Sequence, residues 1–190
     1  GHCNGAKIVA QISHAGAKYH VGPQRPVAPS AMRAAEDAPV PQRLTLEQIE
    51  ELKQSYIAAA VRAQAAGFDG VQVHCAHGYL LSEFVDPYYN HRADAYGGCV
   101  ENRMRLPLEI MHGIKAACGD GYPVFVKVNS NTRADDEQYG EQLVSMVRMF
   151  AEAGAEAVEL SGYDFAPRTR ERLYFLERAA QVKAALPDVP

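Results

Sequence analysis

Three side chains that can hold or give a proton lie within six residues of one another. His74, His77 and Tyr79 occur in VQVHCAHGYLLSEF, residues 71–84, where an apolar run gives way to a turn. Two imidazoles can donate hydrogen bonds to one developing oxyanion, which stabilises a transition state by several kcal/mol. A tyrosine stays protonated at neutral pH and can serve as a general acid. The stretch therefore indicates proton-transfer chemistry, a metal site or ordinary packing.

Metal binding is the weakest of these interpretations. His74 and His77 can ligate one ion, but zinc takes three or four ligands. On a strand Cys75 points away from His74, and no nearby Asp or Glu is an obvious further ligand. We therefore predict no metal site and rank a zinc hydrolase last. For Tyr79, packing at the rim of a sheet explains the spacing equally well.

Short apolar runs alternate with helical patterns along the chain. The apolar runs predict strands at 7–12, 67–75, 122–130 and 155–162. The helical patterns occupy 45–66, 100–118, 137–154 and 171–186. Thr45 and Gln48 form a capping box at the start of the first helix, and Pro107 is expected to kink the second. Because no hairpin turn joins two strands, this order predicts a parallel α/β sheet.

Two α/β architectures fit this order, an open doubly wound sheet and a (β/α)8 barrel. An open sheet that binds a dinucleotide should carry GxGxxG after its first strand, and no strand here is followed by that motif. The barrel is therefore favoured, although 190 residues are few for eight βα units. Barrel chemistry collects at the carboxyl ends of the strands, which here carry Gln11, His14, His74, His77, Lys127, Asn129 and Ser161.

Polar residues at strand ends are expected in any barrel, because loops begin there and water is near. That explanation suffices for His14, Asn129 and Ser161. It is weaker for Gln11 and Lys127, and for His74, because each adjoins apolar strand residues. Burying such a group without a partner costs free energy.

The composition excludes several partners. The chain is 47% hydrophobic and 22% charged, with a net charge of −4, which is typical of a soluble globular protein. It has no basic stripe for nucleic acid and no apolar run of membrane-span length. The four cysteines are widely spaced without a CxxC pair, which predicts reduced thiols in the cytoplasm.

The run GFDGVQVHCAHGYLLSEFVDPYYNHRADAYGGCVENRMRLPLEI, residues 67–110, resembles the Old Yellow Enzyme family of FMN-dependent ene-reductases. AKIVAQISHAG is similar to the family's third barrel strand, RPVAPSAM to the loop after it, PVFVKVNS to the fifth strand and AEAVELSGYD to the sixth. YYNHRADAYGG resembles the bacterial 2-enoate and 2,4-dienoyl-CoA reductase branch. The resemblance implies one domain, residues 1–190, that comprises about strands 3 to 6 of a (β/α)8 barrel.

The resemblance also implies the site residues. Gln11 matches the glutamine that hydrogen-bonds the pyrimidine edge of FMN. His74 and His77 match the pair that binds the substrate carbonyl oxygen over the flavin, which implies that His74 also borders the cofactor. Many relatives carry asparagine at the position of His77. Tyr79 matches the proton donor. Lys127 stands where many members carry an arginine near flavin N1 and O2, and it keeps the positive charge without the bidentate fork.

The implied activity is hydride transfer from NADH or NADPH, through FMN, to the activated C=C bond of an enone or enoate. His74 and His77 would polarise the carbonyl, and Tyr79 would protonate the α-carbon. The alternative is a truncated, non-catalytic barrel fragment, since the family's outer strands and FMN phosphate loops are expected outside residues 1–190. Such a chain is expected to bind FMN weakly and to self-associate. The substrate, the choice of nicotinamide and homo-oligomerisation stay open.

Overall fold

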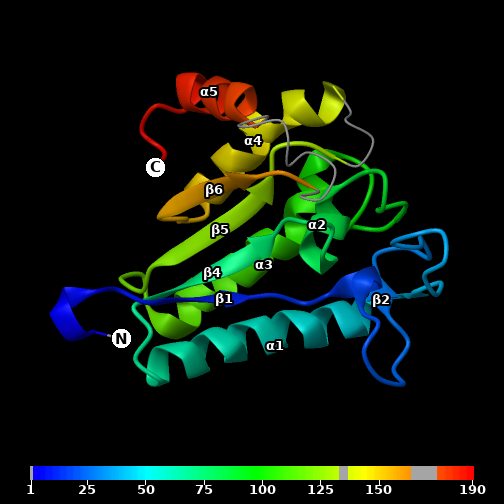
Figure 1. The fold of residues 1–190 in the computed structure, drawn as a ribbon, viewed down its shortest axis with the longest axis horizontal. Helices are drawn as coiled ribbons and strands as arrows, with labels where there is room; N and C mark the ends of the chain where they lie inside the picture. Colours follow the sequence, from blue (N-terminus) through cyan, green and yellow to red (C-terminus); the bar gives the residue numbers. More distant parts are fainter. Residues whose placement is uncertain (1, 133–136, 164–174) are drawn as a thin grey trace.

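A parallel four-stranded sheet organises the chain, in the order β1-β4-β5-β6. The computed structural model describes residues 2–132, 137–163 and 175–190. Within them the strands are β1 (Val9–Ile12), β4 (Gly70–Cys75), β5 (Val124–Asn129) and β6 (Ala157–Ser161). All four run in one direction, so their carboxyl ends meet on the side of the molecule where α2 lies (Figure 1). The predicted parallel α/β sheet is therefore confirmed.

The helices include the four that the sequence predicts, in that order, and one further short helix between the first two of them. They are α1 (Leu46–Ala65), α2 (Leu80–Val85), α3 (Val100–Cys118), α4 (Glu137–Glu152) and α5 (Leu176–Ala185). Both halves of the Thr45–Gln48 capping box are present, and α3 runs without interruption through Pro107. The predicted start of the last helix at 171–174 lies outside the described residues. No helix of the described part is both long and apolar enough to span a membrane.

The long proline-rich segment at 13–44 carries small elements that the sequence did not predict. It contains two short strands, β2 (Val27–Ala28) and β3 (Gln42–Arg43), which pair in parallel. A 3-10 helix, η2 (Gly16–Lys18), follows β1, and another, η1 (Cys3–Gly5), precedes it. Strands of two residues show no periodic pattern, so hydrophobic periodicity does not reveal them.

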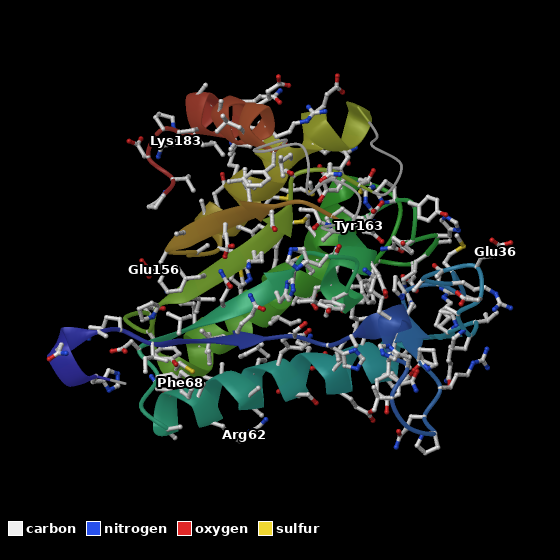
Figure 2. The ribbon with its side chains drawn as sticks, viewed as in Figure 1. Glu36, Arg62, Phe68, Glu156, Tyr163 and Lys183 are labelled. Atoms are coloured by element: carbon white, nitrogen blue, oxygen red, sulfur yellow. The ribbon has the colours of Figure 1, made fainter. Side chains whose placement is uncertain are left out.

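The two faces of the sheet differ in chemistry. Val71, Val73 and Cys75 of β4 are buried in the core on the side of the helices. The alternate residues of the strands project from the other face, and this inner face carries Gln11, Gln72, His74, Lys127 and Glu159. The pairing register sets His74 beside Lys127, and Lys127 beside Glu159. Figure 2 shows Glu156 at the amino end of β6 and Tyr163 beyond its carboxyl end.

Candidate active site

A cavity of about 1030 Å³ opens at the carboxyl ends of β1 and β4. Its walls include four of the five predicted site residues, namely Gln11, His74, His77 and Tyr79. The segment after β1 supplies a further part of the wall, including Lys18 of η2. Residues that are far apart in the sequence therefore meet at one opening, as barrel topology requires.

His74 is held as a neutral hydrogen-bond donor. Its side chain is at the end of β4 and the residue is only 4% exposed. Burial, aided by the charges of His77 and Lys127, lowers the pKa of His74 to about 4 against the opposing charge of Glu159. Nδ1 lies 3.3 Å from the backbone N–H of Ala76 and accepts from it. The single proton of the neutral ring therefore lies on Nε2.

His77 is fixed by groups from three other elements. Its φ of 62° is in the left-handed region that few non-glycine residues adopt. The side-chain oxygen of Asn129, on β5, accepts from its backbone N–H at 2.8 Å, and Lys18 Nζ donates to its carbonyl at 2.7 Å. On the ring, Nε2 lies 2.8 Å from the hydroxyl of Ser161 on β6. Burial, together with the Lys127 and Lys18 charges, lowers the pKa of His77.

Asn129 and Ser161 thus have a role that sequence reasoning did not assign to them. They were explained as ordinary polar residues at strand ends, yet they hold the backbone and the ring of His77. The available signal was their position, since both stand at the carboxyl ends of strands, Asn129 on β5 next to β4 and Ser161 opposite it on β6. The contact with Ser161 also means that His77 must exchange a hydrogen bond before Nε2 can serve a substrate.

Tyr79 stands next to His74 at the entrance to α2. The two ring centroids are 5.2 Å apart in an edge-to-face arrangement, and the centroids of His74 and His77 are 4.8 Å apart. The ammonium of Lys18 lies 5.7 Å from the centre of the Tyr79 ring, within the range of a cation–π contact. The predicted proton-handling trio is therefore a spatial cluster as well as a sequence cluster.

Gln11 and Lys127 are both on the inner face of the sheet, but only Gln11 lines the cavity. Gln11 Nε2 donates to Gln72 Oε1 at 2.6 Å. Lys127 Nζ lies 2.9 Å from a carboxylate oxygen of Glu159. Both side chains are therefore already tied to a neighbouring strand.

Glu83 of α2 is a buried carboxyl group that sequence reasoning missed. The residue is 1% exposed, and its Oε1 accepts from the backbone N–H of Ala17 at 2.9 Å. Burial raises the pKa of Glu83 to about 8, despite the Ala17 hydrogen bond and the Lys18 charge. Ala17 lines the cavity. A protonated carboxyl group in α2 therefore supports the cavity wall.

The described residues contain no group of three His, Cys, Asp or Glu side chains placed to hold a metal ion. Cys75 lies in the core, 1% exposed, on the opposite face of β4 from His74. Burial raises the pKa of its thiol.

The class of protein follows from the fold and from its likeness to solved structures. The chain superposes over its whole length on 32% of a 2-naphthoyl-CoA reductase, solved with 2-naphthoyl-CoA, with a TM-score of 0.86 and 29% identity. It also matches an Old Yellow Enzyme homologue from Zymomonas mobilis, with a TM-score of 0.74 and 32% identity. That match covers 84% of this chain and 48% of the homologue. The four βα units are therefore part of a (β/α)8 barrel of the Old Yellow Enzyme type, as the sequence predicted.

The chain belongs to the NADH:flavin oxidoreductase / NADH oxidase family, whose sequence model matches residues 2–172. It is 38% identical to an NADH oxidase of Thermoanaerobacter brockii, over 95% of this chain and 30% of that protein. It is 37% identical to an NADPH dehydrogenase of Bacillus subtilis, over 83% of this chain and 46% of that protein. The chain thus spans about a third to a half of the length of these relatives.

The site residues fit FMN, the cofactor of this family. Gln11 and Lys127 would hold its polar edge, and His74 would border it. Gln11 lines the cavity and donates through Nε2, and no hydrogen bond to its Oε1 is found within the described residues, so this acceptor stays available. The volume of about 1030 Å³ is at the upper end of the range for small-molecule and cofactor pockets. The predicted cofactor set, FMN with NADH or NADPH as the reductant, agrees with the family.

Proposed function

We propose that residues 1–190 form the FMN- and substrate-binding unit of an oxidoreductase that reduces the activated C=C bond of an α,β-unsaturated carbonyl compound. One observation carries this proposal: a neutral His74, His77 and Tyr79 converge at one cavity, with ring centroids about 5 Å apart. The bound 2-naphthoyl-CoA of the solved neighbour supports a conjugated thioester or enoate as the substrate class. Free thiols at Cys75, Cys99 and Cys118 support the cytoplasm as the proposed location.

The histidines polarise the substrate in this proposal. His74 offers Nε2–H to the carbonyl oxygen as a neutral donor, because its Nδ1 accepts from the backbone N–H of Ala76. His77 supplies the second donor after it exchanges its contact with Ser161. Hydrogen bonds that strengthen as the oxygen gains negative charge lower the barrier. FMN, when bound, supplies the hydride that it takes from NADH or NADPH.

Tyr79 completes the reaction as the acid. Its hydroxyl gives a proton to the α-carbon of the substrate while the carbonyl oxygen is held by the histidines. The edge-to-face packing against His74 keeps the tyrosine next to the oxygen site. Lys18 reaches over the Tyr79 ring and donates to the His77 carbonyl, so one cation orders both sides of the cavity.

The test separates the two halves of the reaction. In the FMN-loaded protein, Tyr79→Phe should leave reduction by nicotinamide unchanged and slow oxidation by an enone about 100-fold or more, the usual effect of losing a general acid. Stopped-flow absorbance of the flavin measures both rates. Tyr122→Phe is the control, because its hydroxyl is at the amino end of β5 and has no hydrogen-bond partner in the described structure. Equal loss in both halves would remove Tyr79 from the donor role.

A further inference from the structure

A chain of polar side chains crosses all four strands on the inner face of the sheet. Lys127 Nζ lies 2.9 Å from one carboxylate oxygen of Glu159, and Gln72 Nε2 donates to the other at 2.9 Å. Gln72 Oε1 accepts from Gln11 Nε2 at 2.6 Å. This hydrogen-bonded chain therefore begins at Gln11 and ends at Lys127, the two predicted cofactor-binding residues outside the histidine pair. Glu159 is the group that joins Lys127 to the two glutamines.

The carboxylate also determines which way each amide points. An ionised carboxylate can only accept hydrogen bonds, so Gln72 must present its NH₂ group to Glu159. The carbonyl oxygen of Gln72 then faces Gln11, and Gln11 must donate to it. This leaves the Oε1 of Gln11 directed elsewhere, as an acceptor. The polarity of an amide on β1 is thus set by a charge on β6, with two strands between them.

The charge on Glu159 is maintained in the folded protein. Partial burial on its own would raise the pKa of Glu159, but the hydrogen bonds from Lys127 and Gln72 and the charge of Lys127 outweigh burial and lower it. The same charge acts on the site, since it opposes the fall in the pKa of both His74 and His77. Glu159 therefore influences both histidines through its charge.

We propose that Glu159 is the positioning residue of the cofactor site, which holds Lys127 directly and orients Gln11 through Gln72. The inference rests on the proposed function for its cofactor, but the hydrogen-bonded chain can be tested without one. Lys127 and Gln11 belong to strands β5 and β1, which do not pair with each other. Glu159 is the residue that makes their placement interdependent.

The substitution that tests this is Glu159→Gln, with Glu156→Gln as its matched control. Glu156 also pairs with a lysine, Lys115 at 3.1 Å, and its side chain is 49% exposed against 51% for Glu159. Glu156 precedes β6, at the far end from the cavity. Both variants remove one surface carboxylate from a lysine pair, but only Glu159→Gln interrupts the hydrogen-bonded chain of side chains.

The first readout is the NMR signal of the Gln11 side-chain amide in the chain without cofactor. A glutamine at 159 cannot accept from Lys127 and Gln72 as two carboxylate oxygens do, so the Gln11 signal should move in Glu159→Gln and stay unchanged in Glu156→Gln. The imidazole pKa values of His74 and His77 should fall further in Glu159→Gln. An unmoved Gln11 signal would overturn the proposal.

The second readout is the dissociation constant of FMN, from a flavin absorbance titration. We expect Glu159→Gln to weaken binding at least tenfold and Glu156→Gln to leave it unchanged. Equal affinity in wild type and Glu159→Gln would overturn the positioning role. A wild-type protein that binds no FMN would count against the proposed function instead. The Gln11 signal would still decide whether the hydrogen bonds link Gln11, Gln72, Glu159 and Lys127.

A further variant covers the case in which Glu159→Gln does not fold. Gln72→Leu removes the middle of the chain while leaving the Lys127–Glu159 pair intact. It should move the Gln11 signal and weaken FMN binding. An unmoved Gln11 signal together with unchanged FMN affinity in Gln72→Leu would overturn the proposal.

Discussion

His77 combines an unfavourable backbone conformation with a candidate role in the site. A non-glycine residue at φ 62° carries strain of about 1 kcal/mol or more, and such strain persists only where surrounding contacts maintain it. Here Asn129 and Lys18 hold the two peptide groups of the residue. The family resemblance places asparagine at this position in many relatives, and asparagine tolerates the same conformation well. The geometry of the backbone thus restricts which donors can stand at residue 77.

The strain can be measured by comparing glycine with alanine. His77→Gly and His77→Ala both delete the imidazole, but only alanine retains a Cβ in the left-handed region. We expect the glycine variant to be more stable by about 1 kcal/mol, a reversal of the usual order. Urea unfolding gives the free energies. Ala76→Gly is the control and should be destabilising, since positive φ at non-glycine residues of the described part occurs only at Asn4 and His77. A more stable alanine variant at 77 would contradict the expectation.

At the scale of elements, α2 connects the core to the cavity. Its six residues are all buried, and its Glu83 reaches back to the N–H of Ala17 on η2. Gly16 lies directly against this carboxyl group, since a Cβ there would come within 2.6 Å of Glu83 Oε2. A short helix thus sets the position of the segment that forms one cavity wall, and it does so through a group whose charge depends on pH.

Glu83 makes stability depend on pH. The pKa of Glu83 is about 8 in the folded chain and near 4.5 when unfolded, so its contribution is complete below pH 4.5 and is lost as the pH rises through 8. Between pH 6.5 and 8 the loss is ~2 kcal/mol. The lowered pKa values of His14, His74 and His77 act in the opposite direction, because the unfolded chain binds more protons at these groups and their contribution to stability rises with pH.

The variant Glu83→Gln should abolish this loss, because its amide oxygen can still accept from Ala17 but does not titrate. Urea unfolding at pH 6.5 and at pH 8 measures the difference. Glu101→Gln, an exposed carboxyl group in the first turn of α3, should retain the wild-type slope. A slope that survives in Glu83→Gln would assign it to another group.

At the scale of the molecule, the inner face of the sheet is open in the described structure. Gln11 and Glu159 are exposed there, although they belong to the face that would line a barrel. Within residues 2–132, 137–163 and 175–190 the sheet has four strands, whereas a family barrel has eight. A cofactor on this face is therefore less enclosed, and contributes less buried surface, than one inside a complete barrel.

We accordingly expect the 190-residue chain to bind FMN at least tenfold more weakly than an eight-stranded relative, and to self-associate through its open face. A flavin absorbance titration and sedimentation velocity measure these two properties. A saturable shift in the flavin bands would extend the enzyme proposal to this chain by itself. A monodisperse monomer with stoichiometric, tight FMN would contradict the expectation, and no shift at all would favour the non-catalytic alternative.

Much of the fold was predictable because its signals are local. Alternation of Val71, Gln72, Val73 and His74 is a property of consecutive residues, and so is the capping box of Thr45 with Gln48. Strand order then followed from topology, and the carboxyl ends located His74, His77 and Tyr79 together. The short pair β2–β3 was missed because two residues carry no period, although the hydrogen bond from Gln42 to Pro26 at 2.8 Å is well formed.

The sequence by itself determined the parallel sheet, the family resemblance and the cluster in VQVHCAHGYLLSEF. Only the tertiary structure decided that Gln72 meets Glu159 across 87 residues, that Asn129 and Ser161 hold His77, and that Glu83 is buried and protonated. The physical reason is range. Periodicity and capping depend on neighbours within a few residues, whereas hydrogen-bond partners and pKa values depend on which strands pair, in which register, and how far water is excluded.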